Sequence, residues 1–236
     1  MLEKLKSITK GLEEIIIIGG GASIKEGISL GLKDKLKDKF VIACNYAYKH
    51  FPHTLLACVD SDFYVPYYMQ RKQNPDIYEE LKKESLIITT ANIDSKVLLP
   101  NTLIVKGSGI YNNNPIKLGF YNPILCGLFA LHLAEYFEPK KIFLLGYDWN
   151  RRNPAPIDRR VYNGHTNLDI HYYNKEEIPH EGIGKIGFYE NHLANQYFKA
   201  FNNSKCKIYN VSLNSNIENF EKITYSEFFN LQKETL

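Results

Sequence analysis

The sequence lacks a marked excess of either charge. Its 236 residues carry 29 lysines and arginines against 26 aspartates and glutamates, for a formal net charge of +3. Proteins dedicated to nucleic acids usually concentrate basic residues on one face, so this near balance argues against nucleic acid as a partner. A local site for an anionic ligand remains compatible with the composition.

Cysteine is scarce and shows no paired spacing. The four cysteines, each in an apolar stretch, are Cys44, Cys58, Cys126 and Cys206. Because zinc sites and redox couples use closely spaced pairs, we interpret these residues as reduced members of the core.

Long apolar runs are also missing. No segment approaches the ~20 apolar residues that a membrane-spanning helix needs. The first 14 residues form a charged amphipathic segment without the apolar centre of a signal peptide. We therefore expect no transmembrane segment and a cytoplasmic location.

The chain does contain a regular alternation of apolar, β-prone runs and helical segments. The run "EIIIIGG" from Glu14 is typical of a strand covered on both faces in a parallel sheet. Further strands are expected within residues 40–48, 53–62, 85–91, 140–149 and 206–212, and helices within 23–37, 77–84, 122–137, 187–201 and 224–234. This alternation predicts an α/β fold, a Rossmann-like three-layer sandwich with a mostly parallel sheet, as one domain over residues 1–236. Ligands of such folds bind at the carboxyl ends of the strands.

The first expected strand ends in the sequence "GGGAS". Glycines at positions 19–21 permit a sharp turn and a close approach of the backbone to a ligand. Ser23 can cap the following helix, whose first N–H groups attract an anion such as phosphate. The segment Gly20, Gly21, Ala22 and Ser23 is therefore a candidate phosphate cradle, although it matches neither G-x-G-x-x-G nor a P-loop. The alternative is a tight turn without a ligand.

Polar residues follow three other expected strands. Asn45 presents one acceptor and two donors, enough to bind a base edge or a ribose hydroxyl, or else it forms a turn with its own backbone. Asp60 and Asp62 have the spacing of a Mg²⁺ or Mn²⁺ site, or are solvated or helix-capping aspartates. Asp148 can orient a ligand or cap a turn. The neighbouring Arg151 and Arg152 can neutralise a phosphate or remain solvated on a loop.

Residues 150–187 carry little apolar periodicity and are rich in Pro, Tyr, His, Asn and Arg. A segment of this length without its own core is commonly a lid or binding loop, so we predict a lid or acceptor-binding insertion here. It contains Tyr162 as a candidate for stabilising a leaving phosphate, and Lys185 as a candidate phosphate contact.

Histidine is the expected general base, because its unperturbed pKa lies near operating pH. Of the seven histidines, His132 lies inside an apolar helical segment and is expected to be structural. His165, His180 and His192 remain as candidates.

Three stretches together resemble a known family. "IIIIGGGASIKE", "VIACNYAYKHF" and, after an apolar helix, "KKIFLLGYDW" resemble the bacterial sialyltransferases of glycosyltransferase family forty-two. They equally resemble a related superfamily that holds the Maf flagellin-glycosylation proteins and the archaeal hydroxymethyldihydropterin pyrophosphokinases. The resemblance covers about Ile15 to Asn216.

The resemblance implies a nucleotide site and a catalytic histidine. The glycine-rich loop and Asn45 would hold the nucleotide, which is CMP-sialic acid in the sialyltransferases and ATP in the pyrophosphokinases. The sialyltransferases open their long apolar helix with Ser-Gly, whereas this chain has Asn122 and Pro123 there. Their histidine precedes the penultimate helix, where this chain has His180, with His192 inside the helix.

The sequence therefore predicts a transferase that moves a sugar from a CMP-sugar donor to a glycan or small-molecule acceptor, with His180 as the base and no firm cofactor. The first alternative is ATP-dependent pyrophosphoryl transfer to a small heterocyclic alcohol, with Mg²⁺ on Asp60 and Asp62. The second alternative is a non-catalytic nucleotide-binding protein. A homo-oligomer is compatible with either enzyme.

Overall fold

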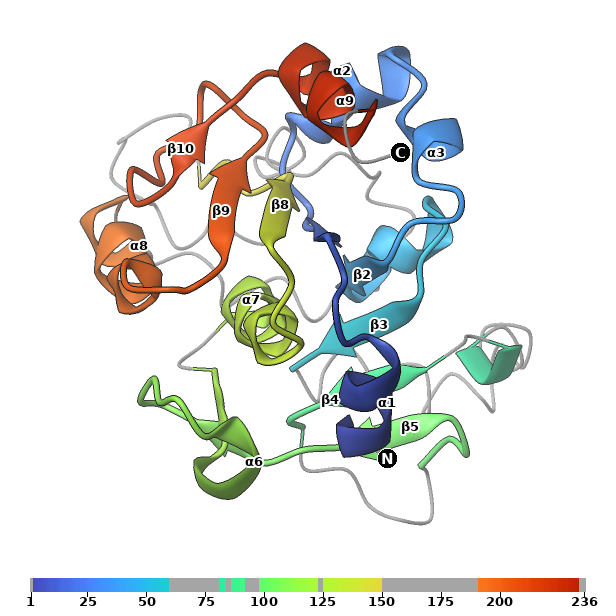
Figure 1. The fold of residues 1–236 in the computed structure, drawn as a ribbon, viewed down its shortest axis with the longest axis vertical. Helices are drawn as coiled ribbons and strands as arrows, with labels where there is room; N and C mark the ends of the chain where they lie inside the picture. The colour runs from blue at the N-terminus through green and yellow to red at the C-terminus, as the bar shows by residue number, and fades with distance from the viewer. Residues whose placement is uncertain are drawn as a thin grey trace, which may run out of the picture.

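Eight parallel strands form the centre of the computed structural model, which describes residues 2–59, 81–83, 86–91, 98–122, 125–149 and 191–233. The strand order is β10-β9-β8-β1-β2-β3-β4-β5, and every neighbouring pair runs parallel. The strands are β1 (Glu14–Ile18), β2 (Val41–Cys44), β3 (Leu55–Cys58), β4 (Ile87–Thr89), β5 (Thr102–Ile104), β8 (Lys141–Leu145), β9 (Lys207–Asn210) and β10 (Glu221–Lys222). The predicted α/β sandwich with a mostly parallel sheet is confirmed (Figure 1).

Helices cover both faces of this sheet. They are α1 (Leu2–Ile8), α2 (Ile24–Ser29), α3 (Leu32–Lys35), α6 (Pro115–Leu118), α7 (Cys126–Tyr136), α8 (Asn191–Phe198) and α9 (Tyr225–Lys233), with short 3-10 helices η1 (Asn45–Lys49) and η5 (Lys199–Phe201). A separate pair of two-residue strands, β6 (Gly107–Ser108) and β7 (Phe120–Tyr121), lies outside the main sheet.

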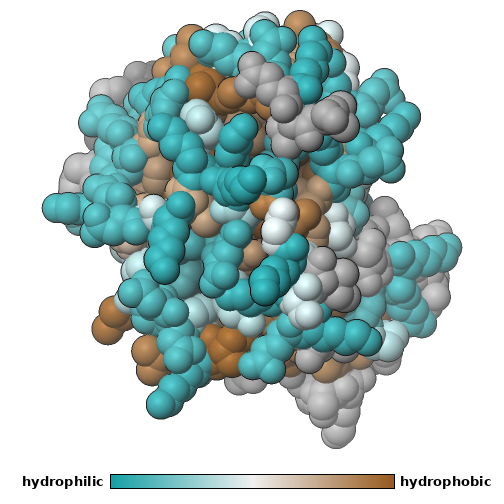
Figure 2. Space-filling model, in the orientation of Figure 1, coloured by the Kyte–Doolittle hydropathy of each residue, from teal (hydrophilic) through white to brown (hydrophobic). Residues whose placement is uncertain are grey.

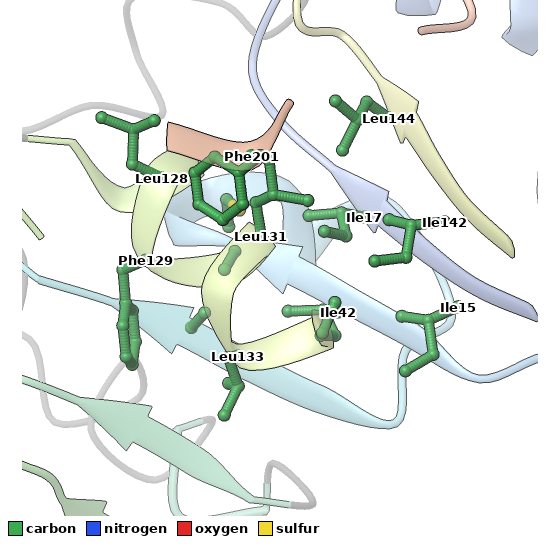
Figure 3. Packing of buried hydrophobic residues seen from close by; sticks show 14 of the residues in the cluster. Ile15, Ile17, Ile42, Leu128, Phe129, Leu131, Leu133, Ile142, Leu144 and Phe201 are labelled. Carbon is green, nitrogen blue, oxygen red and sulfur yellow. The ribbon is translucent and has the colours of Figure 1, made fainter. Parts of the chain in front are cut away.

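The isoleucines of β1 divide between two cores because side chains alternate along a strand. Ile16 and Ile18 pack in a cluster that contains residues of α3 and α9, whereas Ile15 and Ile17 pack in a cluster dominated by α7. Figure 3 shows the second cluster, with Leu131 of α7 over the isoleucines of β1, β2 and β8. All four isoleucines are fully buried, and burying such a side chain contributes about 1.5–3 kcal/mol.

Three differences from the sequence prediction have local causes. The helix expected over 23–37 is split into α2 and α3, because Gly31 between them adopts φ +80. The strand expected over 40–48 ends at Cys44, because Asn45 adopts φ 48 and opens η1. The edge strands β5 and β10 are only three and two residues long and were not anticipated.

Other sequence expectations are met within the described residues. All four cysteines are buried and none of them forms a disulfide, as predicted. None of the helices described is long and apolar enough to cross a membrane. The insertion predicted over 150–187 lies outside the described residues.

Candidate functional site

The side of the sheet on which successive strands are added changes at β1. From β1 the chain adds β2 to β5 on one side, then returns to place β8 on the other side, followed by β9 and β10. Open α/β sheets bind ligands at such a switch point, outside the carboxyl ends of the strands. Two loops meet there, residues 19–23 after β1 and residues 146–149 after β8.

Hydrogen bonds join these two loops closely. The N–H of Gly19 donates to the carbonyl of Leu145 at 2.8 Å, and the N–H of Gly21 donates to the carbonyl of Gly146 at 2.9 Å. Ser23 donates twice to Asp148, from its N–H to Oδ2 at 2.7 Å and from its hydroxyl to Oδ1 at 2.5 Å. Two N–H groups of the predicted phosphate cradle, those of Gly21 and Ser23, are therefore already bonded to the chain's own oxygens.

The glycines serve this contact between loops. A Cβ on Gly21 would lie 2.6 Å from the carbonyl oxygen of Gly146 and 2.7 Å from Oδ2 of Asp148. A Cβ on Gly19 would lie 2.8 Å from the same carbonyl oxygen. The close backbone approach that the sequence assigned to a ligand is thus made to the β8 loop.

The capping role predicted for Ser23 is wrong. Ser23 is the N-cap residue of α2, but its side chain makes no hydrogen bond to the helix. Its hydroxyl instead donates to the buried carboxylate of Asp148. Asp148 is therefore a partner of Ser23 across the switch point.

Tyr147 anchors the β8 loop to the helix layer. Its hydroxyl donates to the carbonyl of Gly127 in the first turn of α7 at 3.0 Å and lies 3.9 Å from Sγ of Cys44. Burial raises the pKa of Tyr147 well above its ordinary value, so the hydroxyl stays protonated as a donor.

The β8 loop is also held from the β9 side, by residues that sequence analysis missed. Asn210 Nδ2 and Ser215 Oγ donate to the carbonyl of Tyr147, at 3.1 and 2.7 Å. Asn216 donates its N–H to the carbonyl of Asp148 and its Nδ2 to that of Trp149, at 2.8 and 3.0 Å. The only sequence signal was the run of polar residues after an apolar strand.

Asn45 is the unusual residue at this edge. The parallel register pairs Ile18 with Ala43, so Asn45 and Gly20 lie two residues beyond the same level on adjacent strands. Asn45 has φ 48, and its side-chain oxygen is buried without a hydrogen-bond partner among the described residues. A left-handed backbone and an unpaired buried acceptor each cost free energy, and such features concentrate at functional sites.

Asn122 lies further along the same edge. Its Nδ2 donates to Oγ1 of Thr90 at 2.7 Å, and its buried Oδ1 is without a partner in the described part of the chain. Thr90 follows β4, which is two strands from β2 and therefore about 10 Å away. The structure thus brings Asn45, Gly20, Gly21, Ala22, Ser23 and Asp148 to the switch point, with Asn122 set apart.

His132 is structural, as its apolar surroundings predicted. Nδ1 accepts from the N–H of Tyr121 at 2.6 Å, and Nε2 lies 3.0 Å from the carbonyl of Asn112. Both contacts are satisfied by a neutral ring protonated at Nε2. Burial lowers the pKa of His132 to about 4.

The remaining predicted site residues lie outside the described residues: Asp60, Asp62, Arg151, Arg152, Tyr162, His165, His180 and Lys185. His192 belongs to α8, near its start at Asn191, and its side chain is not described. Within the described ranges, His, Cys, Asp and Glu side chains form no group of three that could hold a metal ion.

Comparisons with known proteins find similarity only among solved structures. No family model and no curated protein matches the sequence. The α-2,3-sialyltransferase Cst-I from Campylobacter jejuni aligns at TM-score 0.49 and 15% identity, over 95% of this chain and 96% of that one. A tyrosine variant of the sialyltransferase Cst-II, in complex with CMP, aligns at TM-score 0.46 and 15% identity, over 90% of this chain and 86% of that one.

Neither of these structures is a Maf protein or a pyrophosphokinase, so that part of the sequence resemblance gains no support. At this identity and TM-score the likeness transfers no function to the chain.

Proposed function

We propose that this chain is a glycosyltransferase of the sialyltransferase type, which binds a CMP-sugar at the carboxyl edge of β1 and β2. Asn45 carries the proposal, because its left-handed backbone and unpaired buried oxygen coincide at the position that the family resemblance assigns to the nucleotide. The amide oxygen would accept a hydrogen bond from the cytosine amino group or from a ribose hydroxyl.

Asp148 determines which part of the nucleotide faces the glycine-rich loop. Its carboxylate is bonded to Ser23, so the loop already holds a negative charge. A second negative charge about 4 Å away would cost about 4 kcal/mol at an effective dielectric constant near 20. We therefore propose that the neutral nucleoside faces the loop, and that the phosphate extends toward Arg151, Arg152 or Lys185.

The proposed reaction needs one base and no metal. His180 would take the proton of the acceptor hydroxyl, whose oxygen then attacks the anomeric carbon of the sugar. The bond from that carbon to the phosphate oxygen breaks, and CMP departs with the bonding electron pair. Tyr162 would stabilise the departing phosphate as a hydrogen-bond donor.

The nucleotide preference of the wild-type chain tests this function. CMP with EDTA should raise the melting midpoint, because a ligand at 100 times its Kd adds about 2.7 kcal/mol to the free energy of unfolding. ATP with Mg²⁺ should not raise it. Differential scanning fluorimetry with both nucleotides, each with EDTA and with Mg²⁺, provides the measurement.

Three results would contradict the proposal. The melting midpoint could rise only with ATP and Mg²⁺, and Asp60→Asn could remove that rise. This result would favour pyrophosphoryl transfer over glycosyl transfer. No shift with any nucleotide would overturn the placement of a nucleotide at this edge. A shift with CMP but no turnover of CMP-sialic acid would indicate the non-catalytic binding protein.

The base is tested separately by turnover. His180→Ala should lower the rate of CMP release from CMP-sialic acid by about 10²- to 10⁴-fold while CMP affinity is kept, because a general base acts in the transition state. His165→Ala and His192→Ala serve as matched controls. A comparable loss in either control, with His180→Ala fully active, would reassign the base.

A further inference from the structure

Four large apolar side chains gather on the surface of one short segment. Ile104 at the end of β5, Ile110, and Ile116 and Leu118 of α6 are 42%, 78%, 44% and 51% exposed. We call these four side chains the apolar patch. Figure 2 shows hydrophobic residues at the lower left of the molecule, where Figure 1 places α6.

Contacts join the loop that carries Ile110 to the end of α6. Nδ2 of Asn112 donates to the carbonyl of Gly119, just after α6, at 2.8 Å, and to the carbonyl of Ile110 at 3.4 Å. A Cβ on Gly119 would lie 3.2 Å from Cγ of Lys106, so the stem of that lysine runs against the end of α6. Ile110, Lys106 and the end of α6 therefore lie close together.

The exposure of Ile110 is built into the loop. Oγ of Ser108 accepts from the N–H of Ile110 at 3.1 Å and donates to the carbonyl of the same residue at 2.8 Å. His132 of α7 also contacts Asn112, two residues after Ile110, and Tyr121, which follows α6. These contacts fix the chain on both sides of α6 to α7. A loop fixed in this way exposes the apolar side chain of Ile110 to water, which is unfavourable. Burying that side chain against a partner surface would lower the free energy.

The segment that carries the patch, residues 104–118, has only positive charges of its own, and Glu135 of α7 accepts a hydrogen bond from the hydroxyl of Tyr111 within it at 2.6 Å. Lys106 and Lys117 are exposed beside it. The sequence has no aspartate or glutamate between positions 95 and 134. A second copy of the same patch would bring these lysines against their equivalents, so the charge disfavours a symmetric dimer here and favours an anionic surface.

We propose that the apolar patch docks on an anionic lipid surface. Protruding isoleucine and leucine side chains would enter the boundary between head groups and acyl chains, and Lys106 and Lys117 would contact lipid phosphates. This docking does not depend on the proposed transferase activity.

Vesicle co-sedimentation of the full chain tests this docking. Wild type should bind vesicles of phosphatidylcholine and phosphatidylglycerol in equal amounts, and bind pure phosphatidylcholine far less. Lys106→Glu with Lys117→Glu should weaken partition by at least about 25-fold, since each lysine near an anionic surface contributes roughly a factor of five. Ile110→Ser with Leu118→Ser should also weaken it, and added salt should weaken binding of wild type.

Matched changes elsewhere control for general effects. Leu30→Ser with Leu213→Ser changes two other apolar side chains, 45% and 57% exposed, and Lys33→Glu with Lys205→Glu repeats the charge change at exposed lysines. These variants should bind as wild type does, and thermal midpoints should show that every variant is folded.

Absence of wild-type binding to the mixed vesicles would overturn the proposal, as would equal losses in the control variants. A concentration-dependent dimer that Ile110→Ser with Leu118→Ser abolishes, seen by light scattering without vesicle binding, would show instead that the patch joins two copies of the chain.

Discussion

At the scale of single residues, His132 shows how one buried side chain makes stability depend on pH. Its pKa is lowered to about 4 by burial, against about 6.5 in an unfolded chain. Between these values the unfolded chain binds more protons than the folded one, so the free energy of unfolding should fall as pH falls from about 6.5 to 4. The loss from this residue should total about 3 kcal/mol, since one pKa unit corresponds to about 1.4 kcal/mol.

Urea unfolding of wild type and His132→Gln across this pH range checks the prediction. The glutamine variant should be less stable at neutral pH, because it cannot reproduce both bonds to Tyr121 and Asn112, and the difference between the two proteins should shrink as the pH falls. A constant difference from pH 7 to pH 4 would show that His132 is not held neutral.

At the scale of elements, the contact between the β1 and β8 loops makes the stability of the fold depend on Gly21. Gly21→Ala should lower the melting midpoint strongly, because the added Cβ would meet the carbonyl of Gly146 and the carboxylate of Asp148. Gly109→Ala is the matched control, since a Cβ there meets nothing within 4 Å. Equal midpoints for the two variants, measured by circular dichroism, would contradict the tight packing of these loops.

The elements also show what sequence patterns can and cannot predict. The Ile-rich run of β1 and the apolar length of α7 were recognisable because burial on both sides leaves a continuous apolar signal. The bond between Ser23 and Asp148 joins residues 125 positions apart, and no local pattern contains it. Ser23 was therefore not paired with Asp148 from the sequence, and the phosphate cradle stays a prediction.

Only part of the candidate site was predicted from the sequence. Asn45 was found because a polar residue directly after an apolar strand must lie at the carboxyl edge of a parallel sheet. Its left-handed backbone and unpaired oxygen could only come from the structure. Asn210, Ser215 and Asn216 were missed because their role is to hold another loop.

At the scale of the whole molecule, the fold separates two surfaces with different chemistry. The carboxyl edge at the switch point joins polar side chains from β1, β2 and β8. The apolar patch lies beyond β4, on the end of the edge strand β5 and on the segment that links it to α7. A nucleotide at the first surface and a lipid surface at the second would therefore contact different parts of the chain.

The affinity of Asn45→Gly for CMP, measured by isothermal titration calorimetry, tests the central claim most directly. Glycine tolerates the φ of 48 at this position, so the variant should remain folded while it loses the amide that would bind the nucleotide. We expect CMP affinity to fall about tenfold, the value of one hydrogen bond of about 1.4 kcal/mol, whereas Asn113→Gly, at an exposed asparagine, should bind as wild type does. A folded Asn45→Gly protein that binds CMP as tightly as wild type would contradict the placement of the nucleotide at the carboxyl edge of β1 and β2.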